Sequence, residues 1–306
     1  MSQAQQIQYL TNRKIDKTKW DNCISKADNG LIYAYSFYLD TMAKHWDALV
    51  LNDYEVVMPL TWNSKYGINY LYQPFLAAQL GIFGNNISEE LIEDFIHSIP
   101  TSFRLIEISL NSKNITGIPT GYAMHRSNYT LDLNKPYNTI YSNYKENIRR
   151  NIKKATQLGC IVEKEVDVEE VITLAVQQMK EQSNESSDNI NRFRKLYKFL
   201  NEKKMAAIYG IKLNNELLAS CVFFYSHHRA YYILVGNHPN GKTIGASHFL
   251  IDAFIKDNAD KEMLLDFEGS DIPSLAFFYS SFGAVHEIYP ALKINRLPFY
   301  LKWLKR

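Results

Sequence analysis

Residues 236–283 read GNHPNGKTIGASHFLIDAFIKDNADKEMLLDFEGSDIPSLAFFYSSFG, and this stretch decides the fold. Its glycine-containing turn leads into a segment, from about residue 244 to residue 256, that has the apolar spacing of a helix. The apolar run at residues 263–267 has the length of a buried strand, and residues 272–282 again have helical spacing. We therefore expect the order turn, helix, strand, helix in this stretch.

Upstream of this stretch the chain alternates between strands and helices. Three successive strands are expected at residues 206–213, 216–226 and 230–235, with Asn214-Asn215 as the first hairpin turn. The elements before them are, in order, a helix at residues 141–155 that Gly159 ends, a strand at 160–165, and helices at 168–182 and 191–203. Antiparallel hairpins followed by alternating strands and helices predict a mixed α/β sheet, not a doubly wound parallel one.

The N-terminal half resembles a shorter version of that order. Its expected elements are strands at residues 7–10, 48–51, 54–62, 69–74, 104–110 and 123–131 and helices at 35–45 and 88–98. Pro136 cannot extend a sheet ladder, and the chain becomes helical after it. We therefore predict two domains of mixed, mostly antiparallel sheet flanked by helices, over residues 1–135 and 136–306. The basic, amphipathic run 296–306 is expected to form a last helix that docks on the first domain.

The composition is that of a globular chain and excludes several classes of protein. Its 306 residues are 46% hydrophobic, which is enough for sizeable buried cores. The net charge of +2 provides no global field that would recruit nucleic acid or a membrane, so any anion site must be local. No apolar run approaches the roughly 20 residues of a membrane span, and the first residues lack the apolar core of a signal peptide. Three scattered cysteines, Cys23, Cys160 and Cys221, argue against a disulfide framework and favour a reducing, cytoplasmic environment.

The turn before residue 244 is a candidate phosphate site. Lys242, Thr243, Gly245 and Ala246 deliver the chain into a helix, and a helix N-terminus presents unpaired N–H groups and a partial positive charge. Small residues let the backbone approach a pyrophosphate, and Lys242 adds a counter-charge. The alternative interpretation is a closely packed helix start with no ligand.

The order of this turn, helix, strand and second helix resembles the second half of the GNAT superfamily of acyltransferases. In that superfamily the acyl-CoA pyrophosphate loop reads R/Q-x-x-G-x-G/A, and the later helix carries Y-x-x-x-G-F. Tyr279 and Gly283 match the second motif, with Ala284 in place of its phenylalanine. Lys242 and Gly245 match the basic and first glycine positions of the loop. The resemblance implies acyl-CoA as co-substrate, with no permanently bound cofactor.

The same resemblance implies roles for individual residues. Tyr279 would be the general acid that protonates the leaving thiolate, because the ordinary pKa of a tyrosine, about 10, lies above that of a thiol. Backbone N–H groups near the end of the strand 230–235 would stabilise the oxyanion. Glu268 is the first candidate for the general base, with Asp266 and His238 as further candidates. The structural alternatives are an aromatic core residue for Tyr279 and a loop-pinning carboxylate for Glu268.

The chain also resembles a narrower group, the Fem family of tandem proteins that add amino acids from aminoacyl-tRNA to peptidoglycan precursors. The similarity lies in the basic helix YSNYKENIRRNIKKATQLGCIV at residues 141–162 and in the Phe-Glu-Gly-Ser and Phe-Gly sequences near the end. By this resemblance Arg149 and Arg150 would bind a substrate phosphate or another polyanion. Fem proteins carry a lysine where this chain has Tyr279, which favours an acyl-CoA-type donor over tRNA. A solvent-facing helix is the alternative interpretation of the cations.

Together these observations predict an acyltransferase that moves an acyl group from acyl-CoA to an amine or similar acceptor held between the two domains. A Fem-like aminoacyltransferase and a catalytically silent, ligand-binding tandem scaffold are the alternatives. His227 and His228 are read as strand residues whose side chains point to opposite faces, so they cannot share a metal ion, and we expect no metal site.

Overall fold

The computed structural model describes residues 6–119, 121–180, 186–269, 271–299 and 301. Its internal contacts separate two compact units: unit 1 comprises residues 1–126 and 288–306, and unit 2 comprises residues 127–287. The change of unit at Arg126 differs from the predicted boundary at residue 135, because Pro136 is the N-cap of a helix inside unit 2. The return of the last strand to unit 1 depends on long-range pairing, which local sequence does not reveal.

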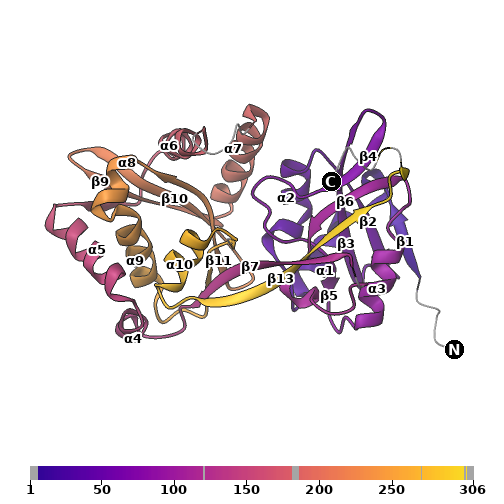
Figure 1. Cartoon of the computed structure of the whole chain (residues 1–306), viewed down its shortest axis with the longest axis horizontal. Helices are drawn as coiled ribbons and strands as arrows, with labels where there is room; N and C mark the ends of the chain where they lie inside the picture. Colours follow the sequence, from indigo (N-terminus) through magenta and orange to yellow (C-terminus); the bar gives the residue numbers. More distant parts are fainter. Residues whose placement is uncertain (1–5, 120, 181–185, 270, 300, 302–306) are drawn as a thin grey trace. The chain divides into compact units, whose positions relative to one another are not determined.

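Unit 1 is a mixed sheet with helices packed on it (Figure 1). Its elements are β1 (Ile7–Leu10), α1 (Lys17–Lys26), α2 (Ser36–Met42), β2 (His45–Leu51), β3 (Val56–Lys65), β4 (Ile68–Tyr72), β5 (Phe83–Gly84), α3 (Glu89–His97), β6 (Phe103–Ser109) and most of β13 (Val285–Asn295). The sheet order is β1-β2-β3-β4-β6-β13, with β5 beside β3. Neighbouring strands are antiparallel except β4 and β6, which are parallel.

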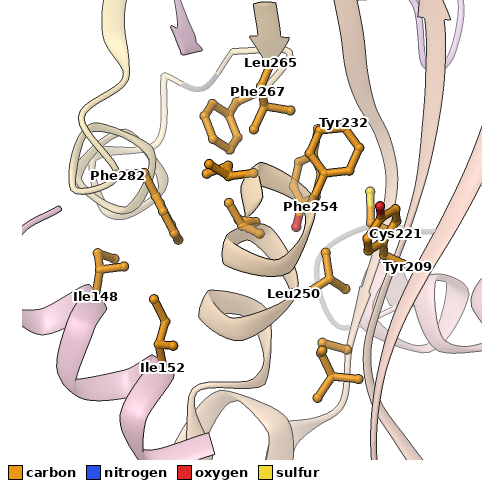
Figure 2. Packing of buried hydrophobic residues seen from close by; sticks show 14 of the residues in the cluster. Ile148, Ile152, Tyr209, Cys221, Tyr232, Leu250, Phe254, Leu265, Phe267 and Phe282 are labelled. Atoms are coloured by element: carbon orange, nitrogen blue, oxygen red, sulfur yellow. The ribbon is translucent and has the colours of Figure 1, made fainter. Parts of the chain in front are cut away.

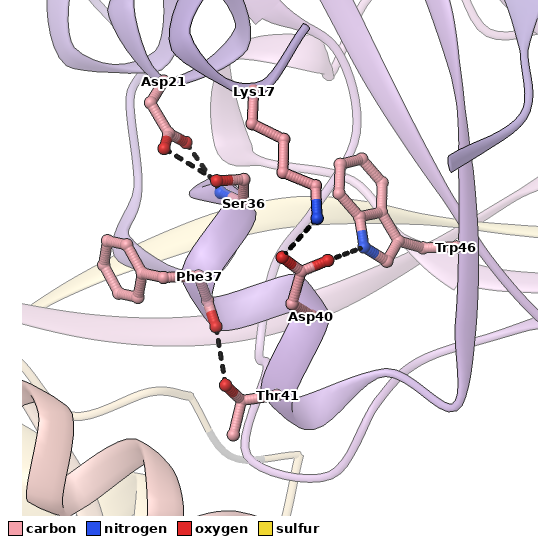
Figure 3. Close-up of polar contacts among 7 residues, drawn as sticks. All are labelled: Lys17, Asp21, Ser36, Phe37, Asp40, Thr41 and Trp46. Atoms are coloured by element: carbon pink, nitrogen blue, oxygen red, sulfur yellow. Dashed lines mark hydrogen bonds and ion pairs between the residues drawn. The ribbon is translucent and has the colours of Figure 1, made fainter. Parts of the chain in front are cut away.

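Polar contacts fix the two N-terminal helices of unit 1 against β2 (Figure 3). Asp21 of α1 accepts hydrogen bonds from the backbone N–H and the hydroxyl of Ser36 at the start of α2, both at 2.7 Å. Asp40 of α2 accepts from the ammonium of Lys17 and from the indole N–H of Trp46. The helices are therefore held by directional bonds as well as by the apolar core.

Unit 2 has the same kind of sheet with more helices. Its elements are β7 (Ala123–Asp132, mostly in unit 2), α4 (Tyr137–Ser142), α5 (Glu146–Gln157), β8 (Ile161–Glu163), α6 (Val168–Lys180), α7 (Ser187–Glu202), β9 (Ala206–Leu213), β10 (Glu216–Ser226), β11 (Arg229–Asn237), α8 (Pro239–Ile244), α9 (Ala246–Asn258), β12 (Leu264–Asp266) and α10 (Pro273–Ser280). The sheet order is β7-β12-β11-β10-β9-β8, and only β11 and β12 pair in parallel.

Several local signals form as the sequence predicts. Ser88 caps α3 by accepting a hydrogen bond from the N–H of Leu91, and Gly159 follows α5 with a left-handed φ of 85°. Asn214 and Asn215 both have positive φ in the turn between β9 and β10, as a two-residue hairpin requires.

Two local predictions are wrong. The turn expected before residue 244 is mostly a short helix, α8, which ends at Gly245 with its left-handed φ of 83°; the helix expected at residues 244–256 does form, as α9. His227 and His228 are not strand residues. Both have φ near 50° and form the tight turn that joins β10 to β11, a conformation for which their sequence carries no glycine signal.

The core of unit 2 lies on the sheet face that α5, α9 and α10 cover. Figure 2 shows Leu250 and Phe254 of α9 between Ile148 and Ile152 of α5 and Cys221 of β10. The rings of Phe254 and Phe223 stack with centroids 3.7 Å apart. This packing fixes α9 and α10 against the middle of the sheet, where the candidate site lies.

The helix predicted over residues 296–306 lies largely outside the described residues. Its first residue, Arg296, belongs to unit 1, where its N–H donates to Arg104 O and its guanidinium donates to the carbonyl oxygens of Ile99 and Pro100. Within the described part of the chain, every helix is too short or too polar to cross a bilayer.

Candidate active site

The sheet of unit 2 opens between β11 and β12. These strands pair only from Arg229 opposite Leu264 to Tyr231 opposite Asp266, whereas β11 continues to Asn237. A bulge at Ile233 bends β11 where the pairing ends, because Val222 faces Leu234 and Phe223 faces Tyr232. Beyond Tyr231, β11 is therefore paired with β10 on one edge, and on the other edge no strand of the described residues pairs with it.

The N–H of Val235 points into this opening. The N–H of His238 donates to Leu218 O on the β10 side, and the N–H of Asn237 donates to the side chain of Gln178 on the other side. Successive N–H groups of a strand point to opposite edges, so that of Val235 lies on the same edge as that of Asn237. The pairing thus leaves the N–H of Val235 as a backbone donor beside the bulge. From the sequence, such donors were expected only somewhere near the end of this strand.

Tyr279 of α10 lies beneath the opening, in contact with aromatic rings. Its ring stacks on Phe267 at 4.6 Å and meets Tyr232 edge-on at 6.4 Å between centroids. The residue is 7% exposed, and burial together with the nearby Cys221 and Glu268 raises the pKa of its phenol well above the ordinary value. Among the described residues, its hydroxyl has no hydrogen-bond partner. The group stays protonated at neutral pH, as a general acid must.

Glu268 lies in the turn that carries the chain away from β12. It has a left-handed φ of 63°, which is unfavourable for a residue with a side chain, and Gly269 after it has a φ of 84°. The carboxyl of Glu268 contributes to the raised pKa values of Cys221 and Tyr279 through its charge. The structure therefore brings Glu268 and Tyr279, from a turn and a helix, into electrostatic contact.

The other two acidic or basic candidates are already engaged. The carboxylate of Asp266 accepts from Arg229 at 2.6 Å and from the N–H of Glu268 at 2.8 Å, so it holds the turn in place. Burial alone would lower the pKa of Arg229, but the charge and hydrogen bond of Asp266, together with the charges of Tyr231 and Glu287, outweigh burial and raise the pKa. The imidazole of His238 accepts from the N–H of Asn240 and caps α8. Both residues have structural roles here.

The residues of the predicted pyrophosphate loop do not form an open cradle. Lys242 and Thr243 lie in α8, and the ammonium of Lys154 donates to Thr243 O at 2.9 Å. Gly245 and Ala246 are buried, and a Cβ atom built on Gly245 would lie 2.6 Å from the backbone oxygen of Asn151 in α5. Helix α5 thus covers the turn that a coenzyme A pyrophosphate would need, so these residues do not fit that group.

Arg149 and Arg150 lie side by side on α5 in different environments. The guanidinium of Arg149 donates to Ser142 O at 2.7 Å and lies over the ring of Tyr141. Arg150 is exposed and, among the described residues, has no charged or hydrogen-bonding partner. Only Arg150 of this pair is therefore free to bind a substrate anion without breaking an existing contact.

His248 is a residue that sequence reasoning missed. It lies in the first turn of α9, edge-on to Phe278 at 4.9 Å, and burial lowers the pKa of its imidazole to about 4. Its Nε2 lies 3.5 Å from the amide nitrogen of Asn151, and its Nδ1 is buried without a partner. The sequence gives no signal for this site beyond a histidine on a predicted helix.

The family model that matches this chain covers a part of unit 2. Residues 142–271, within unit 2, match the family model described as acetyltransferase (GNAT) domain. A search of curated proteins gave no significant match.

Solved structures resemble the chain over almost its whole length. The crystal structure of FemX has a TM-score of 0.67 at 13% identity, covering 97% of this chain and 99% of that one. The C-terminal domain of a putative lysylphosphatidylglycerol synthetase from Agrobacterium fabrum has a TM-score of 0.57 at 9% identity, covering 94% of each chain. A tandem GNAT protein from the clavulanic acid biosynthesis pathway has a TM-score of 0.52 at 6% identity, covering 96% and 99%. These likenesses confirm the predicted mixed, tandem fold.

Proposed function

We propose, on the premise that this protein belongs to the GNAT superfamily and has a Fem-like tandem fold, that unit 2 transfers an acyl group from an activated carbonyl to an amine. One observation carries the proposal: the sheet opens between β11 and β12 directly beside Tyr279. An opening of this kind lets an extended acyl substrate reach backbone N–H groups and an acid in the middle of a packed sheet.

The reaction requires three catalytic roles from the protein. The lone pair of a neutral amine forms the new C–N bond, the carbonyl oxygen becomes an oxyanion, and the bond from the acyl carbon to the leaving sulfur or oxygen breaks. A proton leaves the attacking nitrogen, and another joins the leaving group. The site must therefore accept one proton, donate one, and stabilise a negative charge between these events.

The N–H of Val235 is the proposed oxyanion donor. It points into the opening, and the bulge at Ile233 sets its angle to the rest of the strand. A rigid backbone donor is aimed before the reaction begins, so it costs little reorganisation when the oxyanion forms. Only proline removes a backbone N–H, and in this strand it would also disturb the pairing with β10, so the role is not tested by substitution at Val235.

Tyr279 and Glu268 are the proposed acid and base. The raised pKa of Tyr279 keeps its proton in place until a strongly basic leaving group appears. Glu268 accepts the proton that the amine loses, directly or through water, and its nearby charge opposes formation of a phenolate at Tyr279. The proton of Glu268 can then restore Tyr279, so the pair returns to its starting state after each transfer.

The packing at Gly245 bears on the donor. Since α5 occupies the surface that a coenzyme A pyrophosphate would use, we propose an activated ester or thioester that is held along the opening and not by that turn. Aminoacyl-tRNA, the alternative donor, needs no pyrophosphate cradle. The unpaired cation of Arg150 favours this second candidate.

Replacing Tyr279 by phenylalanine tests the proposed chemistry. With acetyl-CoA and charged tRNA as donors and a panel of primary amines, turnover of Tyr279→Phe should fall about a hundredfold or more. Tyr225→Phe is the matched control. Tyr225 is a half-buried tyrosine of β10 that pairs with Ala230 beside the turn joining β10 to β11. Unchanged turnover in Tyr279→Phe would place this residue in the core and end the proposal.

The donors are separated by their dependence on salt. Activity with charged tRNA should fall steeply with salt and with Arg150→Gln, whereas activity with acetyl-CoA should respond weakly to both. Tight, saturable binding of acetyl-CoA would contradict our interpretation of the covered turn. Ligand binding without turnover of either donor would support the silent scaffold instead.

A further inference from the structure

The sheet of unit 2 has another unpaired stretch, on the edge of β9 that faces β8. These two strands pair only over residues 161–163 and 210–212, whereas β9 begins at Ala206. Residues 206–209 therefore pair with β10 on one edge, and on the other edge no strand of the described residues pairs with them. Unpaired backbone groups along a strand are a template on which a further strand can form.

The N–H and C=O groups of Ala206 and Ile208 point to this open edge. The C=O of Met205 accepts from the N–H of Tyr225, so it faces β10. Successive residues of a strand direct their backbone groups to opposite edges, so those of Ala206 and Ile208 face away from β10. None of the described residues hydrogen-bonds to them there. The edge thus offers two donors and two acceptors in the alternating pattern of a strand.

The open edge is the floor of a groove of about 420 Å³, which we call the β9 groove. It is lined by residues 164–166 after β8, by Tyr197 and Asn201 of α7 and by residues 206–209. Neither the hydroxyl of Tyr197 nor the side-chain amide of Asn201 forms a hydrogen bond with a described residue. Both groups are therefore available to a ligand that pairs with the edge.

Lys164 forms the wall of the β9 groove on the side of α9. Its ammonium pairs with Asp257 of α9 at 2.7 Å and lies 5.4 Å from the centre of the Tyr209 ring. The hydroxyl of Tyr209 donates to the same carboxylate at 2.8 Å. These contacts hold the wall in place, so the width of the groove is set before a ligand binds.

Two cations stand at the end of the groove where β9 begins. Lys203 and Lys204 form the turn between α7 and β9, are exposed and have no acidic partner among the described residues. A strand that pairs antiparallel with β9 runs in the direction of β8, so its C-terminal end comes to this turn. A carboxylate at that end would meet both cations.

We propose that the β9 groove binds an extended peptide segment of a partner protein as an added antiparallel strand, with a carboxylate at its C-terminal end beside Lys203 and Lys204. Four residues of a strand span about 13 Å. Over that length the peptide would exchange backbone hydrogen bonds with Ala206 and Ile208, while its side chains alternate between the α7 and α9 sides. This site is separated from the open edge of β11 by β10, and it does not depend on acyl transfer.

The geometry favours a peptide over other occupants. Donors and acceptors that alternate along one line match another extended backbone, and neither a nucleic acid nor a free phosphate offers that pattern. A second copy of this chain would have to bring its own β9 edge with the walls that flank it. Those walls would meet before the two short edges could pair, whereas an isolated extended segment has no walls.

Amide hydrogen exchange in the free full chain, resolved by residue, tests the open edge. The N–H groups of Ala206 and Ile208 should exchange about tenfold or more faster than those of Ala207 and Tyr209, which face β10. Equal protection of all four would show that the edge is closed and would overturn the site.

A phage-displayed library of random octapeptides with free C-termini tests binding to the full chain. Selected peptides should bind in fluorescence anisotropy, and Ala206→Pro should weaken their binding about tenfold, because proline removes the edge N–H. Proline is tolerated as the first residue of a strand, and this N–H faces away from β10, so the ladder with β10 remains. Ala206→Ser keeps the N–H and is the matched control.

Methylated peptides make the test independent of how well a variant folds. N-methyl groups on the peptide residues that face β9 should each weaken binding to the parent protein about tenfold. N-methyl groups on the intervening residues, whose N–H groups point away from β9, should have little effect. An equal loss at every position, or no loss at any, would overturn the added strand.

The direction of the peptide is tested by charge. Lys203→Gln with Lys204→Gln should weaken binding of a selected peptide about fivefold, and less at high salt, but should not change binding of its C-terminally amidated, uncharged form. Lys195→Gln is the control, because this exposed lysine lies about 200° round α7 from Tyr197. Equal losses in both variants would contradict the antiparallel direction.

Two further outcomes would overturn the proposal. One is a library that yields no peptide whose binding is sensitive to Ala206→Pro. The other is a dimer in solution that Ala206→Pro dissociates, because a second copy would then occupy the edge.

Discussion

The sheets of the two units differ at the same place, the junction of their parallel strand pair. In unit 1, β4 pairs with β6 up to its last residue, Tyr72, and the edge beyond is sealed. The side chain of Gln73 accepts from the N–H of Ser109, and Leu80 bridges to Leu110. In unit 2, β11 continues past β12 with that edge open. The open edge, and not the fold, is the reason why we propose the reaction for unit 2.

The chemistry of the two junctions differs in the same way. The segment that seals unit 1 is held by buried amides: Asn111 donates to the carbonyl oxygens of Leu80 and Ile82, and Asn29 and Asn114 also donate to Ile82 O. These amides therefore pair with one another and with the backbone of the segment. Unit 2 has instead a buried phenol and a strained acidic turn at its opening. A fully paired network of buried amides stabilises the fold of unit 1.

Breaking the seal of unit 1 gives the largest expected change in stability. Asn111→Ala should lower the free energy of unfolding by about 3 kcal/mol, because the carbonyl oxygens of Leu80 and Ile82 and Oδ1 of Asn114 each lose a buried hydrogen-bond donor. Urea unfolding measures this, with the exposed Asn22→Ala as the control. Turnover per folded molecule should not change. A fall in turnover of the folded protein would assign unit 1 a part in the reaction.

The buried histidine of unit 2, His248, should make the stability of the protein depend on pH. His248 has its pKa lowered from 6.5 to about 4, so the unfolded chain takes up a proton at a higher pH than the folded one. Its contribution to stability is present above pH 6.5 and is lost as the pH falls toward 4. We expect a loss of about 2 kcal/mol between roughly pH 7.5 and pH 5.

His248→Gln isolates this effect. The variant keeps a polar side chain of similar size but cannot titrate. Its free energy of unfolding, measured with urea, should therefore vary with pH by about 2 kcal/mol less than that of the parent. Replacing the exposed His125 by glutamine is the matched control. If parent and His248→Gln have the same slope, the imidazole is accessible to protons in the folded state.

The strained turn of unit 2 gives the smallest expected change. Glu268→Gly should raise the free energy of unfolding by about 0.5–1 kcal/mol, because glycine adopts the left-handed φ of 63° without steric cost. Glu268→Gln keeps the strain and removes the charge, so its stability should stay near that of the parent. Both variants should lose turnover if the carboxylate is the base. Full activity in Glu268→Gln would leave Glu268 only a structural role.

The sequence by itself determined the elements whose signals are local. Ser88 and Gly159 marked helix ends, and the Asn214-Asn215 turn joined two strands, because caps and tight turns depend on residues a few positions apart. The motif at Tyr279 and Gly283 likewise contributed to the resemblance to the superfamily, since its residues lie on one short helix and the turn after it.

Tertiary structure alone determined which residues lie together at the candidate site and which are covered by packing. Gly245 looked like part of a phosphate loop, but its lack of a side chain serves the close approach of α5 at Asn151. The return of β13 to β6, the direction of the Val235 N–H and the burial of His248 all depend on partners far away in the chain. Hydrogen bonds and packing between distant segments carry no local pattern, so only the folded chain could reveal the open edge.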